Sequence, residues 1–433
     1  MAERRRPVLD TAEKPAARVW LPLSLQHLFA MFGATVLVPF LTGLPAEVAL
    51  VTSGLGTLLF MAVTGGRVPA YLGSSFAFIA PLVAGAQVAG PAGALFGAFC
   101  AGGVYVLVAL AVRLFGVGWL ARLLPPVVVG PVIMVIGLGL ASVAVGMAQN
   151  TVGGGSYSLP HFAVALATLA AVLLFSLILR GFFAVVPILL GIVAGYLVAL
   201  AAGLVDLAPV IEAPFLRWPR FDSFVDLLAS QGVPWAVLPI LVPVAIVTIA
   251  EHIGDMIVLS RVTERDFLTS PGLHRTLAGD GLATMLAALL GGPPNTTYGE
   301  NIGVLAITRI FSVWVVAGAA CLAIALGFVG TLSAFLASIP SAVIGGVAIA
   351  LFGVIASSGI RTLIEGRVDF GEKRNLLVAS VILVIGIGGA SLRLSDDFTV
   401  SSMALAAVLG VLLHAILPDK HLAGEAVFGR AHG

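Results

Sequence analysis

The chain has 433 residues, of which 60% are hydrophobic and only 10% are charged, and its formal net charge is +1. A typical soluble domain is about a quarter charged, so a soluble fold could not cover this much apolar side chain with polar surface. The composition therefore excludes a soluble enzyme and a disordered protein, and the near-zero net charge excludes a nucleic-acid binder. Long apolar runs that do not alternate every second residue predict an all-α polytopic membrane protein rather than a β-barrel.

The apolar runs provide fourteen candidate spans, since each span needs about 20 residues to cross roughly 30 Å of hydrocarbon. The third and tenth are poor helices, because one begins with Pro69 and a Gly-Ser-Ser run and the other with Pro293 and Pro294. We expect a short extended segment in each of these two broken spans. The fourteen lie near 20–43, 47–64, 69–88, 91–112, 124–147, 159–179, 182–204, 233–258, 274–291, 296–308, 311–330, 335–357, 375–391 and 399–417.

The positive charges follow the positive-inside rule when the polar first nineteen residues are placed in the cytosol. This orientation puts 19 of the 22 Lys and Arg residues on the cytosolic side, and leaves Arg217, Arg220 and Arg393 outside. We therefore expect an even number of spans, with both termini cytosolic. The cytosolic set is Arg4, Arg5, Arg6, Lys14, Arg18, Arg67, Arg113, Arg122, Arg180, Arg261, Arg265, Arg275, Arg309, Arg361, Arg367, Lys373, Arg374, Lys420 and Arg430.

Fourteen spans divide into seven and seven, and an odd repeat unit starts its second copy from the opposite side of the membrane. This is the inverted-repeat arrangement of many secondary transporters. The two broken spans occupy corresponding places in the two halves, and Gln26-His27 in the first span is echoed by Glu251-His252 in the eighth. A matched pair of interrupted segments is the best indication from sequence of a transporter binding site. Cys100 and Cys321 lie in apolar runs and predict neither a disulfide nor a metal site.

Four acidic residues lie at membrane depth, after a stretch from Glu47 to Asp206 that has none between its ends. A charge at mid-helix costs about 2.5–3.5 kcal/mol on insertion scales, so it usually faces a cavity and has a function. Glu251 and Asp255 are four residues apart, share one helix face and could hold one exchangeable proton between them. The other two are Asp280 and Glu300.

Several of these polar residues also fit a purely structural role. Asp255 is nearer the cytosolic end of its span and is equally well interpreted as a packing carboxylate. For Asp280 we favour a hydrogen bond to a neighbouring helix. His252 projects about 100° away from its neighbour Glu251, so it should not share that face. His27 is as consistent with a hydrogen-bonded core residue as with a proton relay.

The broken spans suggest what the site binds. We expect Ser75-Phe76 and Gly299-Glu300 to meet at mid-membrane on short extended segments, with free backbone N–H groups. Gly299 would let the backbone approach a ligand, and Phe76 and Tyr298 could supply aromatic faces. Two carboxylates and free N–H donors, with no basic residue nearby, suit a neutral planar ring that carries both N–H and C=O groups. That description fits a uracil-like nucleobase.

At these residues the sequence resembles the uracil permeases of the nucleobase–ascorbate transporter family. The resemblance covers nearly all of the chain outside the tails and the 205–232 loop. Its last motif continues as Asn301-x-Gly303 and then Thr308-Arg309. The matching stretches are Leu25–Val36, Pro69–Phe78, Ala250–Gly254 and Asn295–Gly303.

The resemblance implies a fold, an activity and a set of ligand contacts. It implies proton symport of a base by a protein that is commonly a dimer, with no cofactor. Glu251 and Glu300 would hold the N–H groups of the base, the amides of Phe76 and Gly299 would meet its carbonyls, and Ala34 and Tyr298 would pack beside it. Proton coupling would involve Glu251, Asp255 and His27. The implied parts are an N-terminal tail (1–19), a core domain (20–113 and 233–330), a gate domain (124–204 and 335–417), an extracytoplasmic loop (205–232) and a C-terminal tail (418–433).

One departure from the family and several alternatives remain. Asp255 stands where the best-matching uracil permeases have a histidine, which leaves the proton relay open. Glu300 and its neighbours favour uracil over xanthine, since xanthine and urate members tend to have Gln at that position. A purine permease, an anion transporter of the same architecture, an intramembrane enzyme and a channel are the alternatives. Glu251 and Glu300 argue against the anion transporter, and the enzyme lacks a nucleophile–base or metal pattern.

Overall fold

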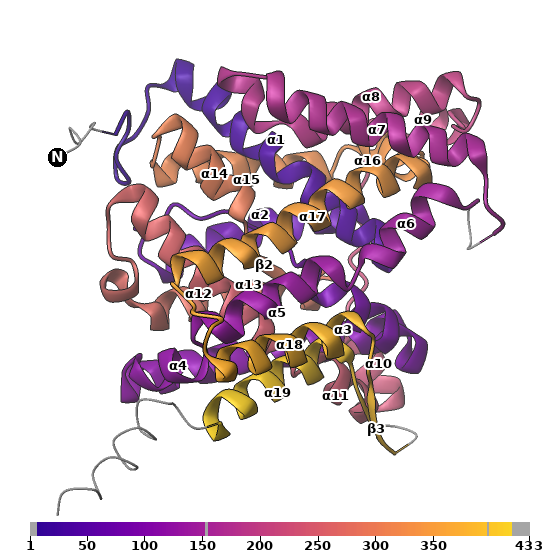
Figure 1. The fold of residues 1–433 in the computed structure, drawn as a ribbon. Coiled ribbons are helices and arrows are strands. Elements are labelled where there is room, and N and C mark those ends of the chain that lie inside the picture. Colours follow the sequence, from indigo (N-terminus) through magenta and orange to yellow (C-terminus); the bar gives the residue numbers. More distant parts are fainter. Residues whose placement is uncertain (1–6, 152–154, 396–397, 418–433) are drawn as a thin grey trace, which may run out of the picture.

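The computed structural model describes residues 7–151, 155–395 and 398–417. The first six residues of the predicted N-terminal tail and the whole predicted C-terminal tail, 418–433, lie outside the described residues. The described chain is mostly helical (Figure 1). Its first half contains α1 (Ala17–Thr42), α2 (Ala46–Val63), β1 (Leu72–Ser74), η1 (Phe76–Phe78), α3 (Ile79–Phe115), α4 (Gly118–Leu123), α5 (Pro126–Leu138), α6 (Ala141–Gln149), α7 (Leu159–Ile178), η2 (Gly181–Val185) and α8 (Pro187–Ala201).

The second half begins in the predicted 205–232 loop, which contains two short helices. It contains α9 (Ala208–Glu212), α10 (Val225–Gln231), η3 (Trp235–Val237), α11 (Leu238–Leu241), α12 (Val244–Thr263), η4 (Leu268–Gly272), α13 (Leu273–Leu289), β2 (Asn295–Thr297), α14 (Gly299–Thr308), α15 (Val313–Gly327), α16 (Gly330–Ala337), α17 (Ser341–Glu365), α18 (Lys373–Ile387), β3 (Leu392–Ser395), β4 (Phe398–Val400) and α19 (Ser402–Ile416).

Several helices are long and apolar enough to cross a membrane. Among the described residues seven stretches meet that standard of length and composition, and α8, α15 and α19 are shorter apolar helices. The chain is therefore a multi-pass membrane protein, and the count of fourteen spans stays a prediction. The seven stretches are Ala17–Thr42, Ala46–Val63, Phe76–Phe115, Pro126–Gln149, Leu159–Ile178, Trp235–Thr263 and Ser341–Glu365.

The helix α3 joins the end of the third predicted span, from Ile79 onward, to the whole of the fourth. At 37 residues it would be about 55 Å long if straight, much more than one bilayer core. Its backbone leaves the helical conformation at Ala89 and at Gly90, whose φ is +70°, and Pro91 follows directly. Glycine adopts this conformation without strain and proline cannot continue the hydrogen-bond ladder, so the element bends where the two predicted spans meet.

The helices pack in two sets that interleave along the chain. In one set α13 packs against α2 and α3, and α15 packs against α1 and α2. In the other set α17 packs against α5, α6 and α7, while α18 packs against α5 and α19. The first set comes from the segments predicted as the core domain and the second from those predicted as the gate domain. Figure 1 shows α17 beside α5 and α6, although some 200 residues separate them in the chain.

Two short antiparallel strand pairs interrupt the helical fold. The pair β1–β2 joins the two predicted broken spans. The pair β3–β4 was not expected, and it shortens the last predicted span, because residues 399 and 400 belong to β4 and α19 begins at Ser402. Phe398, Thr399 and Val400 are aromatic or β-branched residues, which favour a strand over a helix.

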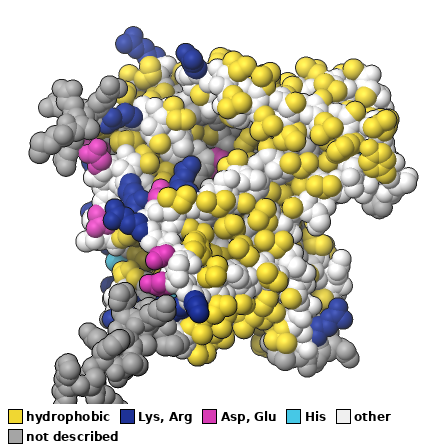
Figure 2. All heavy atoms as spheres, viewed as in Figure 1, with side chains coloured by type: hydrophobic (Ala, Val, Ile, Leu, Met, Phe, Trp, Pro, Cys, Tyr) yellow, Lys and Arg dark blue, Asp and Glu magenta, His cyan; other side chains and the backbone are white. Residues whose placement is uncertain are grey.

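Most of the basic side chains visible in Figure 2 lie on one side of the molecule. The figure shows Lys and Arg along its left side with a smaller group at the lower right, and hydrophobic side chains over the middle of the same face. The described part of the N-terminal tail lies on this side, where Leu9 pairs with Ile310 and Asp10 forms an ion pair with Arg265 at 2.6 Å. An apolar band with cations at one edge is the pattern expected of a protein that spans a bilayer.

Candidate functional site

The two broken segments cross as a buried antiparallel pair. Leu72 lies opposite Thr297, and Ser74 lies opposite Asn295. The backbone N–H of Tyr298 donates to the Tyr71 carbonyl at 3.0 Å, and that of Ser75 donates to the Pro294 carbonyl at 2.8 Å. These hydrogen bonds satisfy the non-helical backbone inside the protein, which the membrane requires. The expectation of short extended segments in the third and tenth spans is therefore confirmed.

A helix begins directly after each strand. Phe76 is the first residue of η1, which leads into α3, and Gly299 is the first residue of α14. The expectation that both residues lie on the extended segments is wrong, since the strands end at Ser74 and Thr297, two residues before each of them. The first N–H groups of a helix have no partner within it, and neither N-cap residue caps its helix with a side chain. Two helix starts whose first backbone N–H groups have no partner within the helix therefore lie at this crossing.

Gly299 differs from the residues before it in its accessibility. The four residues Asn295 to Tyr298 are buried, whereas Gly299 is exposed. A Cβ added at Gly299 would meet only the Asp255 carboxylate, at 3.9 Å. The backbone at the start of α14 is therefore open to a molecule in the interior.

Glu251 and Glu300 approach this open point from two helices. Glu251 lies on α12 and Glu300 in the first turn of α14, the two helices are in contact, and both side chains are half-buried. Glu251 also lies within electrostatic range of Glu300 and Asp255. Among the described residues the buried Oε2 of Glu251 has no hydrogen-bond partner. Buried polar atoms normally have partners, so this oxygen is available to a ligand.

Asp255 is tied to the second broken segment. Its Oδ2 accepts a hydrogen bond from the Thr297 hydroxyl at 2.8 Å, and its Oδ1 faces Gly299. This contact could not be derived from the spacing of α12 alone, because it depends on a strand about forty residues away. The position is one turn from Glu251, at the edge of the open point.

His252 and Asp280 form a separate, fully buried pair. The His252 Nδ1 lies 3.0 Å from the Asp280 Oδ2 and 3.5 Å from the Thr297 hydroxyl. Asp280 therefore contacts a neighbouring helix, as the sequence analysis favoured. His252 faces α13 through this contact, consistent with its predicted direction away from the face of Glu251.

Tyr298 is held by three contacts around its ring. Its hydroxyl donates to the Ser74 carbonyl at 3.0 Å and accepts from the Thr35 hydroxyl at 3.2 Å. The ring lies so close to Gly73 that an added Cβ would come within 2.5 Å of it. Ala34, the residue before Thr35 on α1, is also buried, at 1% exposure. Tyr298 thus joins α1 to both strands.

His27 and Phe76 connect the crossing to other helices. The Asn301 side-chain amide donates to the His27 carbonyl at 3.0 Å and lies 3.2 Å from the His27 Nδ1. Phe76 packs edge-to-face on Phe352 of α17, with ring centroids 6.0 Å apart. Sequence reasoning did not single out Thr297 or Phe352.

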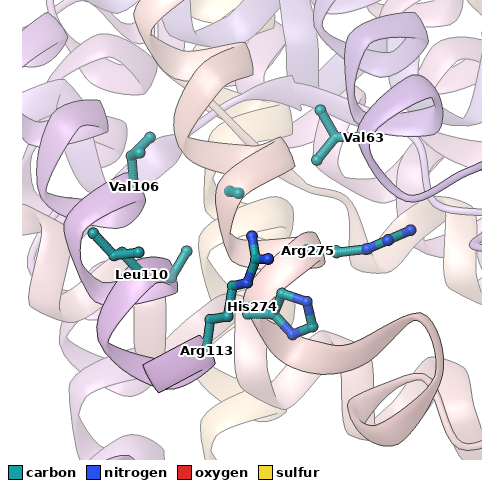
Figure 3. A pocket seen from close by; sticks show the side chains of 8 residues that line it. Val63, Val106, Leu110, Arg113, His274 and Arg275 are labelled. Atoms are coloured by element: carbon teal, nitrogen blue, oxygen red, sulfur yellow. The ribbon is translucent and has the colours of Figure 1, made fainter. Parts of the chain in front are cut away.

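A cavity is lined by residues of α2, α3 and α13 (Figure 3). It has a volume of about 540 Å³ and contains none of the predicted site residues. Within the described part of the chain no cluster of three or more His, Cys, Asp or Glu side chains could hold a metal ion. We call this cavity the arginine pocket, and it is lined by Val63, Val106, Ala109, Leu110, Arg113, His274, Arg275 and Ala278.

Comparison with known proteins identifies this multi-pass membrane protein as a permease and gives its family. A family model described as Permease family (Xan_ur_permease) matches residues 18–394. The chain is 59% identical to the uracil permease of Bacillus caldolyticus, over 98% of each chain. It is 44% identical to the uracil permease of Escherichia coli K12, over 95% of this chain and 94% of that one. The chain therefore belongs to this permease family, the nucleobase–ascorbate transporters.

Solved structures share the fold at low sequence identity. The transmembrane domain of the cyanobacterial bicarbonate transporter BicA superposes with a TM-score of 0.63 at 15% identity, over 92% of this chain and 99% of that one. The structure of SLC26A9 superposes with a TM-score of 0.67 at 13% identity, over 96% of this chain and 66% of that one. At these identities the likeness establishes the fold alone.

Proposed function

We propose that the protein is a proton-coupled symporter that imports uracil across the cytoplasmic membrane. The observation that carries the proposal is the meeting of two helix starts, at Phe76 and Gly299, with the half-buried carboxylates of Glu251 and Glu300. The uracil permeases at 59% and 44% identity support the choice of base.

Uracil matches the donors and acceptors of this site. Its ring presents N–H groups and carbonyl oxygens in one plane. In our proposal Glu251 and Glu300 accept the ring N–H groups, and the backbone N–H groups of Phe76 and Gly299 donate to the ring carbonyls. Ala34 and Tyr298 pack beside the ring. The contacts of Tyr298 with Thr35, Gly73 and Ser74 support a role in holding the two strands in position.

Proton coupling is assigned to Glu251, with Asp255 and His27 as candidates for assistance. Among the described residues the buried Oε2 of Glu251 has no hydrogen-bond partner, which supports its exchanging a proton when the base binds or leaves. Asp255 lies one turn away and is oriented by Thr297. His27 is connected to α14 through Asn301, one residue after Glu300.

Movement of the site is assigned to the two sets of helices. The core domain, 20–113 and 233–330, carries the site, and the gate domain, 124–204 and 335–417, provides the surface against which it moves. The packing of α13 and α15 within one set and of α17 and α18 within the other supports this division. The proposal also includes fourteen spans in an inverted repeat, cytosolic termini and a homodimer. The cations at one edge of Figure 2 support the orientation.

An anion transporter is the second candidate, favoured by the fold shared with BicA and SLC26A9. Two carboxylates at the meeting point of the helix starts would repel an anion. A purine permease of the same family is a third candidate. Uptake of labelled xanthine and bicarbonate beside uracil separates the three.

The test is uptake of labelled uracil into proteoliposomes with and without an imposed proton gradient. We expect accumulation that requires the proton gradient and is unaffected by a sodium gradient. Glu251→Gln should abolish accumulation, because an amide cannot release a proton, and should retain uracil exchange at a reduced rate. Glu365→Gln, which removes a carboxylate paired with Arg261 at the surface, is the control and should transport normally. Accumulation that follows sodium and ignores a protonophore would disprove the coupling.

A further inference from the structure

The arginine pocket is not used by the proposed transport mechanism. It opens between α2, α3 and α13 and has a volume of about 540 Å³. None of the residues assigned to uracil or proton binding lines it. A cavity of this size can hold a small ligand or part of a larger one.

The pocket combines two kinds of lining. Arg113, Arg275 and His274 provide cationic or ionisable nitrogen groups, and the remaining five side chains are apolar (Val63, Val106, Ala109, Leu110 and Ala278). In Figure 3, Arg113 extends from α3 toward the His274 ring on α13, and Arg275 extends on the side of Val63. Its lining includes no carboxylate. This composition suits a ligand with an anionic group joined to an apolar chain.

The two arginines of the pocket differ from other arginines on the same side of the protein. Arg261 forms an ion pair with Glu365 at 2.7 Å, and Arg265 forms one with Asp10 at 2.6 Å. Arg113 and Arg275 have no such partner in the described ranges 7–151, 155–395 and 398–417. Their positive charge is therefore available to an external anion.

The position of the pocket along the helices matches the boundary between lipid headgroups and acyl chains. Arg113 is two residues before the end of α3, and Arg275 is in the first turn of α13. Val106 lies seven residues before Arg113, about 10 Å deeper along the helix. Leu107, Leu110 and Leu114 are 66%, 50% and 66% exposed, and their spacing places them in one apolar stripe beside the pocket. An acyl chain can follow this stripe inward from a headgroup at the arginines.

We propose that the arginine pocket binds one anionic phospholipid, with the phosphate at the basic end of the pocket that Arg113 and Arg275 line and one acyl chain against Val106 and Leu110. Charge complementarity and the apolar continuation of the pocket select this occupant. Free phosphate would use the cations alone and leave the apolar lining without a function. The site is formed by α2, α3 and α13 within one set of helices and does not depend on the identity of the transported base.

Native mass spectrometry of the purified protein tests this proposal directly. The probes are phosphatidylglycerol and phosphatidylcholine with identical acyl chains, and inorganic phosphate. We expect one phosphatidylglycerol to bind at least tenfold more tightly than phosphatidylcholine. The double variant Arg113→Gln/Arg275→Gln should lose that preference. The matched control Arg122→Gln/Arg361→Gln removes two other exposed arginines, makes the same change in net charge and should keep the preference.

A second measurement locates the lipid without any substitution. Phosphatidylglycerol with a photoactivatable group on its acyl chain should label the Val106–Leu110 segment of α3. Equal loss of binding in the two double variants would show a general charge effect and overturn the site. Displacement of the lipid by millimolar phosphate would show an anion site rather than a lipid site. Labelling spread over all helices would likewise exclude a specific pocket.

Discussion

The two broken segments, 72–78 and 295–301, have the same backbone arrangement and very different side chains. Each is a three-residue strand followed at once by a helix start, and the strands pair with each other. The first segment, from Leu72 to Phe78, carries no ionisable group. The second carries Glu300, and through Thr297 and Asn301 it contacts Asp255 and His27.

The two segments share one backbone geometry, but only one of them carries ionisable side chains. Both segments can offer backbone N–H groups at a helix start, which bind carbonyl oxygens of a ligand without regard to side chains. Only the second segment connects these groups to carboxylates and to a histidine. A base that carries both N–H donors and carbonyl acceptors therefore needs both segments. Backbone N–H groups of either segment can bind its carbonyls, whereas its N–H groups need the carboxylates at the second segment.

The largest effect should come from the carboxylate of the second segment. We expect Glu300→Gln to weaken uracil affinity at least tenfold, because a hydrogen bond to a charged group contributes about 1.5–3 kcal/mol. The comparison variant in the first segment is Ser75→Ala, which should change affinity less than twofold. Isothermal titration of both purified variants with uracil measures the difference. Equal losses would show that the first segment also contributes side-chain chemistry.

Glycines in the two segments should respond in opposite ways. A Cβ at Gly73 would lie 2.5 Å from the Tyr298 ring, whereas a Cβ at Gly299 would meet only Asp255, at 3.9 Å. We expect Gly73→Ala to destabilise the protein by about 1–3 kcal/mol, the usual cost of overpacking. Gly299→Ala should leave stability unchanged and weaken uracil binding. Thermal unfolding in detergent with and without uracil distinguishes the two variants.

Two results would contradict this difference between the glycines. A stable Gly73→Ala variant would mean that Tyr298 can move and is not a fixed support of the crossing. Unchanged uracil binding by Gly299→Ala would remove the start of α14 from the site. Both variants keep the same backbone hydrogen bonds, so the difference reports the space around each Cα.

The sequence predicted the broken segments well because local chemistry determines them. Prolines and the Gly-Ser-Ser run cannot sustain a helix, whatever surrounds them. The contacts of Tyr298 could not be predicted, because Gly73, Ser74 and Thr35 reach it from more than 200 residues away. A contact between Asp280 and a neighbouring helix was expected from the depth of Asp280 in its span. Its partner, His252, could not be predicted, because that contact depends on how α12 packs against α13.

The strand β4 could not be predicted from the sequence either. Residues 399 and 400 are apolar or β-branched and continue smoothly into an apolar run, so the pattern was consistent with a helix. Pairing with β3 decides the local structure instead. Short apolar stretches do not distinguish strand from helix by periodicity alone.

The smallest effect we expect comes from the link between the second segment and α12. The Thr297 hydroxyl donates to Asp255 at 2.8 Å, while the neighbouring Thr296 hydroxyl is buried and has no partner among the described residues. Thr297→Val removes one hydrogen bond, about 0.5–1.5 kcal/mol, so uracil affinity should fall about two- to tenfold as Asp255 loses its orientation beside Gly299.

Thr296→Val is the matched control for this link. It makes the same change of side chain one residue away on the opposite face of β2, and it should leave affinity unchanged and stability equal or slightly higher. In an Asp255→Asn background, Thr297→Val should cost less than it does alone, because the two residues act through one hydrogen bond. Additive losses in this double-mutant cycle would separate Thr297 from Asp255. The second segment would then act on the base through Glu300 and its backbone alone.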